Sequence, residues 1–201
     1  MIKTIIFDWA GVLTVGRYTR SILNILEKRE GASLNKIYSQ FDDLIVKMGM
    51  GDVSFQEFVN SVNNKFGIKI KESEMFDVFG KAIIPNKEVI DIAKGLQARY
   101  NLILMSDNEE TTVKILKKEH KEMLGLFKKL YFSYELGIKK PDPKFYKRVL
   151  EDSNLNPSEC VFIDDKEKNI ESARKFGING ILFLNINQLK KELLDLGVSF
   201  N

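Results

Sequence analysis

Short apolar runs recur along the chain and alternate with amphipathic stretches in its second half. The runs predict strands over Thr4–Trp9, Leu102–Ser106, Leu130–Tyr134, Cys160–Asp164 and Gly180–Leu184. From Pro85 onward a helical pattern follows each run before the next one begins. Strands that alternate with helices are typical of a parallel sheet with helices on both faces. We therefore predict an α/β fold with a doubly wound parallel sheet.

The stretch between the first strand and Pro85 has a different pattern. It shows helical periodicity, as in YTRSILNILEKRE and SFQEFVNSVNNKFG, and no convincing strand. We predict an all-helical insertion over residues 17–81, and a core domain formed by residues 1–16 and 82–201. We expect the insertion to have its own apolar core, built from aromatic residues at helical spacings, namely Phe41, Phe55 and Phe58.

Composition and charge narrow the class of protein. With 201 residues the chain is long enough for one substantial core and short for two independent domains. Its 44% hydrophobic and 29% charged residues are typical of a soluble globular protein. The net charge is only +3, and lysines alternate with glutamates, as in KKEHKEM over residues 117–123. Such alternation is typical of a solvated helix face, so we expect no nucleic-acid partner.

The single cysteine and the single histidine restrict the chemistry further. Cys160 cannot form an intramolecular disulfide, and its place in an apolar run predicts a buried thiol in a reducing compartment. No apolar run approaches the roughly 18 residues that a membrane span needs, so we expect a cytoplasmic protein that binds no membrane. His120 lies in a polar helical stretch, where we expect it to be exposed. Any metal would therefore be bound mainly by oxygen, which suits Mg²⁺.

Polar side chains gather at the predicted carboxyl ends of successive strands. These strand ends carry Asp8, Ser106-Asp107-Asn108, Lys139-Lys140 and Asp164-Asp165. In a doubly wound sheet, ligands bind at this edge. Two aspartates that converge there repel each other unless a cation lies between them, and oxygen ligands favour Mg²⁺. Asp107 has a second interpretation, as the cap of the helix that follows.

The same group of side chains fits phosphoryl transfer. A metal ion and a lysine together neutralise a dianion, which must happen before a carboxylate can approach it. Ser106 supplies a hydroxyl donor, and the start of the next helix supplies backbone N–H groups for a phosphate oxygen. Asp8 is then a candidate nucleophile that forms an aspartyl-phosphate.

Four short motifs resemble those of the haloacid dehalogenase superfamily of hydrolases. They are FDWAGVL with Asp8, LMSDN with Ser106, KKPDP with Lys140, and FIDDKEKN with Asp164 and Asp165. The resemblance spans essentially the whole chain and implies a Rossmann-like core with a helical cap of subfamily I. Within the superfamily the chain is most similar to small sugar-phosphate phosphatases related to the N-terminal domains of soluble epoxide hydrolases. The resemblance therefore implies a Mg²⁺-dependent phosphomonoester hydrolase that acts on a small phosphorylated metabolite, as a monomer or homodimer.

The resemblance also assigns roles to individual residues. It implies that Asp8, Ser106 and Lys140 are catalytic, and that Ser106 and Lys140 bind the transferring phosphoryl group. Asn108, in the second motif, is a further expected substrate-binding residue.

The metal site implied by the resemblance is built from oxygen atoms. Mg²⁺ would be held by the Asp8 carboxylate, the main-chain carbonyl of Ala10 and the Asp164 carboxylate. Either Asp165 or Asn169 would reach a metal-bound water.

Ala10 departs from the pattern of the superfamily. In most of its phosphatases the residue two positions after the nucleophile is a second aspartate, which protonates the leaving oxygen and later activates water. Ala10 keeps the main-chain carbonyl but has no acid, and a positioned acid or base contributes typically ~10² to 10⁴ in rate. We therefore expect substrates whose leaving group departs easily, such as an anomeric sugar oxygen, an aryl oxygen or an acyl group.

Three other functions remain open on the sequence alone. Phosphonoacetaldehyde hydrolases also have Trp and Ala after the nucleophile, but they need a Schiff-base lysine in the cap, for which Lys47 is the nearest candidate. L-2-haloacid dehalogenases also lack the second aspartate, but they need no metal and carry Tyr at the position of Ala10. A non-catalytic phosphate-binding module is the third, and the presence of Asp8, Lys140 and Asp164 argues against it.

Overall fold

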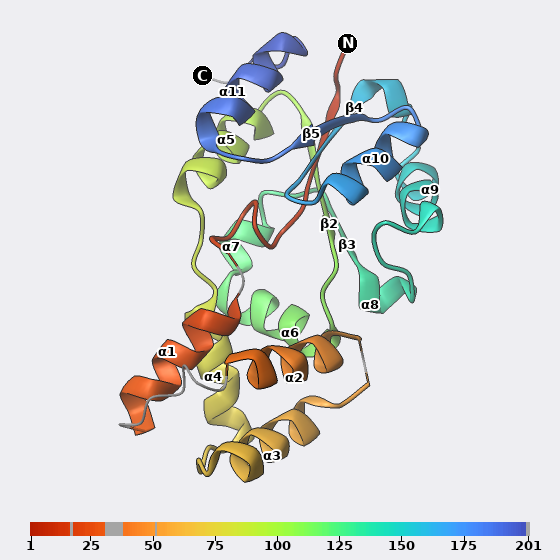
Figure 1. Cartoon of the computed structure of the whole chain (residues 1–201). Coiled ribbons are helices and arrows are strands. Elements are labelled where there is room, and N and C mark those ends of the chain that lie inside the picture. The colour runs from red at the N-terminus through yellow and green to blue at the C-terminus, as the bar shows by residue number, and fades with distance from the viewer. Residues whose placement is uncertain (17, 31–37, 51, 200–201) are drawn as a thin grey trace. The chain divides into compact units, whose positions relative to one another are not determined.

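Parallel strands form the central sheet of the computed structural model, which describes residues 1–16, 18–30, 38–50 and 52–199. The strands are β1 (Thr4–Phe7), β2 (Asn101–Ser106), β3 (Lys129–Phe132), β4 (Cys160–Asp164) and β5 (Asn179–Leu182). Within the described ranges they make one sheet in the order β3-β2-β1-β4-β5, and every neighbouring pair is parallel (Figure 1). The predicted α/β fold class is confirmed.

The strand order reverses at β1, and this reversal positions the site. The chain adds β2 and β3 on one side of β1, and β4 and β5 on the other. Ligands of doubly wound sheets bind at the carboxyl ends of the strands where such a reversal occurs. That point is the end of β1 and β4, where Asp8 and Asp164 stand.

Helices cover both faces of the sheet, as predicted. One face is covered by α9 (Pro143–Asp152) and α10 (Glu167–Lys175), and the opposite face by α5 (Lys87–Gln97) and α11 (Ile186–Asp195) (Figure 1). Strand side chains alternate between the faces, so Ile6 and Phe162 lie in one apolar cluster with α9 and α10. Shorter turns lie at α7 (Lys121–Leu124), α8 (Ser133–Leu136) and η2 (Pro157–Glu159).

The ends of the strands differ slightly from the prediction. β1 stops at Phe7 because the chain turns at the following residues, and β3 stops at Phe132 because α8 begins at Ser133. Cys160, the first residue of β4, is fully buried as expected. Its burial raises the pKa of the thiol to about 11.

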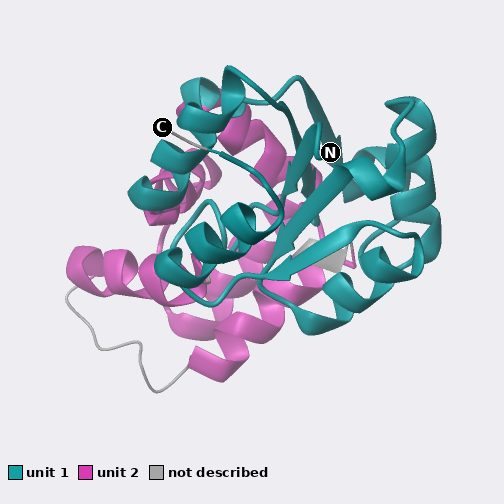
Figure 2. Ribbon diagram, turned by 90° about the horizontal axis from the view of Figure 1, so that it is seen from above, with its two compact units in different colours: residues 1–15, 85–107, 121–201 teal, residues 16–84, 108–120 magenta. Residues whose placement is uncertain are grey.

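The chain groups into two compact units (Figure 2). Unit 1 contains Met1–Val15, Pro85–Asp107 and Lys121–Asn201, and unit 2 contains Gly16–Ile84 and Asn108–His120. Residues 108–120, which the periodicity assigns to the core domain, thus cluster with the helical unit. The start of the predicted insertion, residue 17, lies outside the described residues, and the domain boundaries remain a proposal.

Within its described residues, the regular elements of unit 2 are all helices. Its helices are α1 (Tyr18–Glu30), α2 (Tyr38–Met50), α3 (Phe55–Phe66), α4 (Glu72–Ala82) and α6 (Glu110–Glu119). Phe41, Phe55 and Phe58 are buried there, which confirms the expected apolar core. The rings of Phe55 and Phe58 meet the Phe79 ring edge to face, with centroids 5.5 and 5.6 Å apart.

His120 is half-buried, so the expectation that it is exposed was wrong. His120 directly follows α6. The last turn of α6 packs closely against α4, since a Cβ added at Gly80 of α4 would lie 3.1 Å from Glu119 Cγ. Burial lowers the pKa of the His120 imidazole, and a hydrogen bond to the Gly80 backbone opposes the shift. Periodicity alone does not show this contact, because it depends on a helix distant in sequence.

Across the described ranges, none of the helices combines the length and the apolar character that crossing a membrane requires.

Candidate active site

Two carboxylates meet where β1 and β4 end. Phe7 and Ile163 are partners in the parallel register, and the Asp8 N–H donates to the Ile163 carbonyl at 2.9 Å. Asp8 and Asp164, the next residues along each chain segment, therefore emerge side by side at the same edge. Both side chains are buried, so protein groups and not water must stabilise their charges.

Lys140 lies between these carboxylates. Its Nζ is 2.6 Å from Asp8 Oδ1 and 2.8 Å from Asp164 Oδ2, and it also donates to the Met105 carbonyl at 3.0 Å. Met105 precedes Ser106, so the third contact brings the end of β2 to the same point. The Lys140 side chain is fully buried, and three oxygen acceptors satisfy its three N–H groups.

The loop that carries Lys140 is held by a third aspartate. Asp107 Oδ1 accepts a hydrogen bond from the Lys140 backbone N–H at 2.9 Å. The cap of α6 is Glu109, whose carboxylate accepts from the N–H groups of Thr111 and Thr112. Asp107 thus anchors the lysine loop and does not cap the following helix.

Asp164 is fixed by further donors in the first turn of α10. Its Oδ1 accepts from the Lys166 N–H at 2.9 Å, and Asn169 Nδ2 lies 2.9 Å from both carboxylate oxygens. Together with Lys140, these donors hold the Asp164 carboxylate in one orientation. The sequence marked Asn169 as a candidate for a metal-bound water but did not predict this grip on Asp164.

The charges of the site act strongly on one another because water is excluded. Burial raises the pKa of the Asp8 carboxyl to about 7, the Asp164 carboxylate adds to this shift, and the Lys140 ammonium opposes it. Burial disfavours the Lys140 ammonium, but the carboxylates of Asp8, Asp164 and Asp107 outweigh it and raise its pKa. Burial also raises the pKa of Asp165. The cluster holds an excess of negative charge, which a bound cation would relieve.

The donor set fits a hard divalent cation. One carboxylate oxygen from each of Asp8, Asp164 and Asp165 lies within 4.8 Å of the other two. Asn169 Oδ1 is buried beside them and has no hydrogen-bond partner within the described part of the chain. Carboxylate oxygens without imidazole or thiolate suit Mg²⁺, and an unpaired amide oxygen is a ready acceptor for a water on such an ion.

Gly11 lets Asp165 approach the first strand end. Its φ of +85° lies in the left-handed region, and a Cβ at this position would collide with the Asp165 carboxylate. The sequence offered a signal for this contact, since the glycine directly follows Ala10 at the strand end. That the neighbour of Gly11 is the Asp165 carboxylate is shown only by the structure.

The structure gives the following positions for the other residues that the sequence analysis singled out. Ser106 is buried at the end of β2, beside the residue whose carbonyl binds Lys140. Ala10 is half-buried and pairs with Thr14 in an isolated bridge. Asn108 groups with unit 2, and its role in substrate binding remains a proposal. Lys47 lies exposed on α2 of that unit.

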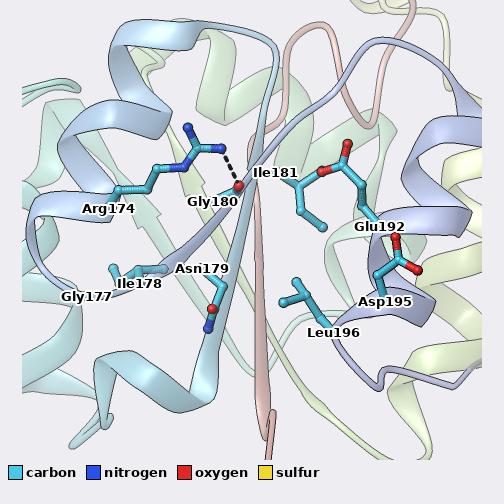
Figure 3. A pocket seen from close by; sticks show the side chains of 9 residues that line it. All are labelled: Arg174, Gly177, Ile178, Asn179, Gly180, Ile181, Glu192, Asp195 and Leu196. Atoms are coloured by element: carbon cyan, nitrogen blue, oxygen red, sulfur yellow. Dashed lines mark hydrogen bonds between the residues drawn. The ribbon is translucent and has the colours of Figure 1, made fainter.

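A surface hollow of about 450 Å³ lies elsewhere in unit 1, beside β5 and between α10 and α11 (Figure 3). Arg174, Glu192 and Asp195 are the charged residues that line it. None of the predicted site residues lines this hollow. It is therefore separate from the carboxylate cluster.

Comparison with known families and proteins agrees with this geometry. A family model described as haloacid dehalogenase-like hydrolase matches residues 2–177. The D-ribitol-5-phosphate phosphatase of Bacteroides thetaiotaomicron is 25% identical over 186 residues, which cover 88% of this chain and 89% of that protein. Flavin mononucleotide hydrolase 1 of Arabidopsis thaliana is 41% identical over 63 residues, but these span only 26% of that protein and 31% of this chain.

A solved structure extends the comparison to three dimensions. The wild-type HAD family enzyme of Bacteroides thetaiotaomicron, in complex with magnesium and inorganic phosphate, superposes with a TM-score of 0.66. The match covers 90% of this chain and 93% of that one, at 25% identity.

Proposed function

Because the chain belongs to the haloacid dehalogenase-like hydrolases, we propose that it is a Mg²⁺-dependent phosphomonoesterase that acts on a small phosphorylated metabolite. The observation that carries the proposal is the buried Lys140 ammonium between Asp8 and Asp164. A fixed positive charge beside a buried carboxylate is what a carboxylate nucleophile needs when it attacks a phosphate dianion. The names of the relatives, a ribitol-phosphate phosphatase and a flavin mononucleotide hydrolase, support the same class of substrate.

The proposed reaction has two steps. An Asp8 oxygen attacks the phosphorus, an aspartyl-phosphate forms, and the bond from phosphorus to the leaving oxygen breaks. Water then attacks the phosphorus of this intermediate, the bond to Asp8 breaks, and inorganic phosphate leaves. Lys140, Ser106 and Asn108 bind the phosphoryl oxygens through both steps.

The residues that would hold Mg²⁺ are Asp8, the main-chain carbonyl of Ala10, Asp164 and Asp165, with Asn169 Oδ1 accepting from a metal-bound water. When bound, Mg²⁺ supplies positive charge that neutralises the phosphoryl oxygens and lets an anionic carboxylate approach the phosphorus. Asn169 Nδ2, the Lys166 N–H and Lys140 hold the Asp164 carboxylate in a fixed orientation for this role.

Ala10 defines which substrates suit the proposed enzyme. Its methyl group can neither protonate a leaving oxygen nor activate water, and a positioned group of that kind contributes typically ~10² to 10⁴ in rate. The proposed substrates are therefore phosphates with easily expelled leaving groups, or substrates that carry their own proton donor.

The alternative functions find less support in the structure. A Schiff base forms from a neutral amine, which burial favours, whereas Lys47 is exposed. A metal-independent dehalogenase does not account for three carboxylates within 4.8 Å of one another. A non-catalytic module does not need a nucleophile paired with a buried lysine.

A buried, unpaired cysteine also supports a reducing, cytoplasmic location.

Hydrolysis of para-nitrophenyl phosphate by the purified full chain tests the proposal. We expect turnover with Mg²⁺, loss of turnover in EDTA, and recovery when Mg²⁺ is restored. Asp8→Asn should lose essentially all turnover, because the amide cannot act as the nucleophile. Asp152→Asn, at an exposed aspartate of α9, is the matched control and should keep it. Turnover by Asp8→Asn at the wild-type rate contradicts the covalent mechanism.

A substrate panel separates the candidate functions. It contains D-ribitol 5-phosphate, flavin mononucleotide, glucose 1-phosphate, phosphonoacetaldehyde and L-2-chloropropionate, each with and without Mg²⁺. Metal-independent halide release would establish the dehalogenase, and borohydride trapping at Lys47 would establish the phosphonate hydrolase. Binding of phosphate esters without turnover would establish the non-catalytic module.

A further inference from the structure

A buried tyrosine outside the carboxylate cluster reaches the helix that supports it. Tyr146 belongs to α9, and its side chain is 1% exposed. Its hydroxyl donates to the backbone carbonyl of Asn169, in the first turn of α10, at 2.9 Å. This contact joins two helices that lie side by side on one face of the sheet (Figure 1).

The carbonyl that receives this bond belongs to the residue that grips Asp164. Asn169 Nδ2 is 2.9 Å from both Asp164 oxygens. The path from the tyrosine hydroxyl to the carboxylate therefore contains one residue. A shift of the Asn169 backbone would displace its amide group and change how that amide holds Asp164, whose other contacts are the Lys140 ammonium and the Lys166 N–H.

The Tyr146 ring is held from two sides, so its hydroxyl has a defined position. The ring meets Phe162 edge to face at 5.8 Å and stacks on Phe176 at 6.0 Å. Phe162 in turn lies 5.4 Å from the Lys140 ammonium. The tyrosine thus contacts the supports of both the aspartate and the lysine of the site.

A second hydrogen bond joins α10 to the loop that carries Lys140. Ser172 Oγ, one turn further along α10, donates to the Pro141 carbonyl at 2.8 Å. Pro141 directly follows Lys140. Helix α10 is therefore bonded to α9 through Tyr146 and to the lysine loop through Ser172, and the Tyr146 bond is the one that acts at Asn169.

We propose that Tyr146 is a positioning residue: its hydroxyl fixes the Asn169 backbone, and through it the orientation in which the Asn169 amide holds Asp164 ready to bind Mg²⁺. The inference rests on the proposed function, because it assigns Asp164 to the metal. Groups that orient metal ligands typically change metal affinity or activity by about 10- to 100-fold when they are removed. Loss of the Tyr146 hydroxyl should weaken Mg²⁺ binding by an amount near the lower end of this range, because Asn169 lies between the hydroxyl and the metal ligand Asp164.

The test compares Tyr146→Phe with Tyr131→Phe. Tyr131 lies in the same apolar cluster, is also buried, and its hydroxyl bonds Ser153 Oγ at 2.7 Å, away from the carboxylates. Each variant loses one oxygen atom and one hydrogen bond, which is buried for Tyr146 and partly buried for Tyr131. A structural role alone predicts similar losses of thermal stability and no difference in the response to Mg²⁺.

Mg²⁺ affinity is measured by isothermal calorimetry and by the rise of the thermal midpoint with Mg²⁺ concentration, and kcat is measured separately at saturating Mg²⁺. We expect Tyr146→Phe to bind Mg²⁺ about 10-fold more weakly than the wild type, and Tyr131→Phe to bind it as the wild type does. Equal affinities in the two variants overturn the positioning role while the proposed function stands. A wild-type protein that neither binds Mg²⁺ nor hydrolyses phosphate esters overturns both.

Discussion

The Lys140 ammonium lies 2.6 Å from the Asp8 carboxylate in a place that water does not reach. Replacing one partner of such a buried pair leaves the other charge uncompensated, which costs about 3–5 kcal/mol. We therefore expect Lys140→Met to lower the free energy of unfolding by about this amount and the rate of hydrolysis by about 10² to 10³. Urea denaturation and para-nitrophenyl phosphate turnover measure the two effects.

The neighbouring lysine provides the control for this prediction. Lys139→Met removes an exposed ammonium one residue away and should change neither quantity appreciably. Mg²⁺ should recover part of the lost stability of Lys140→Met, because a bound cation replaces the missing charge among the carboxylates. Equal effects of the two substitutions would show that the buried ion pair has no special role.

Ala10→Asp should change which leaving groups the enzyme accepts. The new carboxyl can protonate a leaving oxygen, so hydrolysis of alkyl phosphates should rise by about 10² to 10⁴. Aryl phosphates, whose leaving oxygen needs little protonation, should gain much less. Ala10→Asn is the matched control, since it has the same size without an acid. Equal gains for alkyl and aryl phosphates would contradict the role assigned to Ala10.

Gly11→Ala should weaken the metal site more than it weakens the fold. The substitution places a methyl group against the Asp165 carboxylate and also adopts a left-handed backbone, which costs about 1–2 kcal/mol. Gly137→Ala has the same backbone cost at a φ of +65°, but nothing lies within 4 Å of its Cβ. Gly11→Ala should lose more stability than Gly137→Ala because of the added clash, and only Gly11→Ala should show a smaller stabilisation when Mg²⁺ is added. An undiminished response in Gly11→Ala would mean that Asp165 does not help to hold the ion.

The cap of α3 should make the stability depend on pH in acid. The Glu57 carboxylate accepts from the Ser54 N–H at 2.7 Å and the Ser54 hydroxyl at 2.8 Å, which lowers its pKa below the usual value near 4.5. The folded state thus releases this proton more readily than the unfolded state. Its contribution is complete above the unfolded pKa and is lost as the pH falls through the lowered folded pKa.

Glu57→Gln isolates this contribution. The difference in free energy of unfolding between the wild type and Glu57→Gln should be largest at neutral pH and should shrink as the solution becomes strongly acidic. Urea denaturation at a series of pH values measures it. A difference that is constant through the acid range would count against the ionised cap.

The open edge of β5 is covered by side chains, and removing them should promote self-association. Arg174 Nη2 donates to the Gly180 carbonyl at 2.9 Å (Figure 3), and Gln188 Nε2 donates to the Leu182 carbonyl at 2.9 Å. The Phe183 N–H donates to the Asp164 carbonyl at 2.9 Å, so Gly180 and Leu182 direct their backbone groups away from β4. Exposed strand edges pair readily with other chains.

The double variant Arg174→Ala with Gln188→Ala should therefore form dimers or larger species at concentrations where the wild type does not, as measured by light scattering after size exclusion. Its stability should change by no more than about 1 kcal/mol, since both side chains are partly exposed. Arg148→Ala, which breaks an exposed ion pair with Asp152 on α9, is the control and should not associate more than the wild type. Association to the same extent in both would point to a loss of surface charge and not to the edge.

The fold class could be predicted from the sequence pattern, as could the residues proposed for the active site. Alternating apolar runs and helical patterns depend on burial of one face at a time, which is a local property, and they predicted every strand of the described sheet to within a few residues. Asp8, Ser106, Lys140 and Asp164 could be assigned to one edge because parallel strands end together. The burial of Cys160 was predicted from the apolar run that contains it, and the phenylalanine core of the helical stretch from the helical spacing of its aromatic residues.

How these residues act on one another depends on contacts between segments that are distant in sequence. Strand order is not written in periodicity, so the side-by-side emergence of Asp8 and Asp164 followed from β1 pairing with β4. The hydrogen bonds of Asp107, Asn169 and Tyr146 join segments distant in sequence, where spacing gives no signal. The grouping of α6 with the helical unit, and the burial of His120 that follows, depend likewise on which helices pack together. Local pattern fixes which groups a chain offers, and packing between distant segments fixes their distances, their hydration and therefore their chemistry.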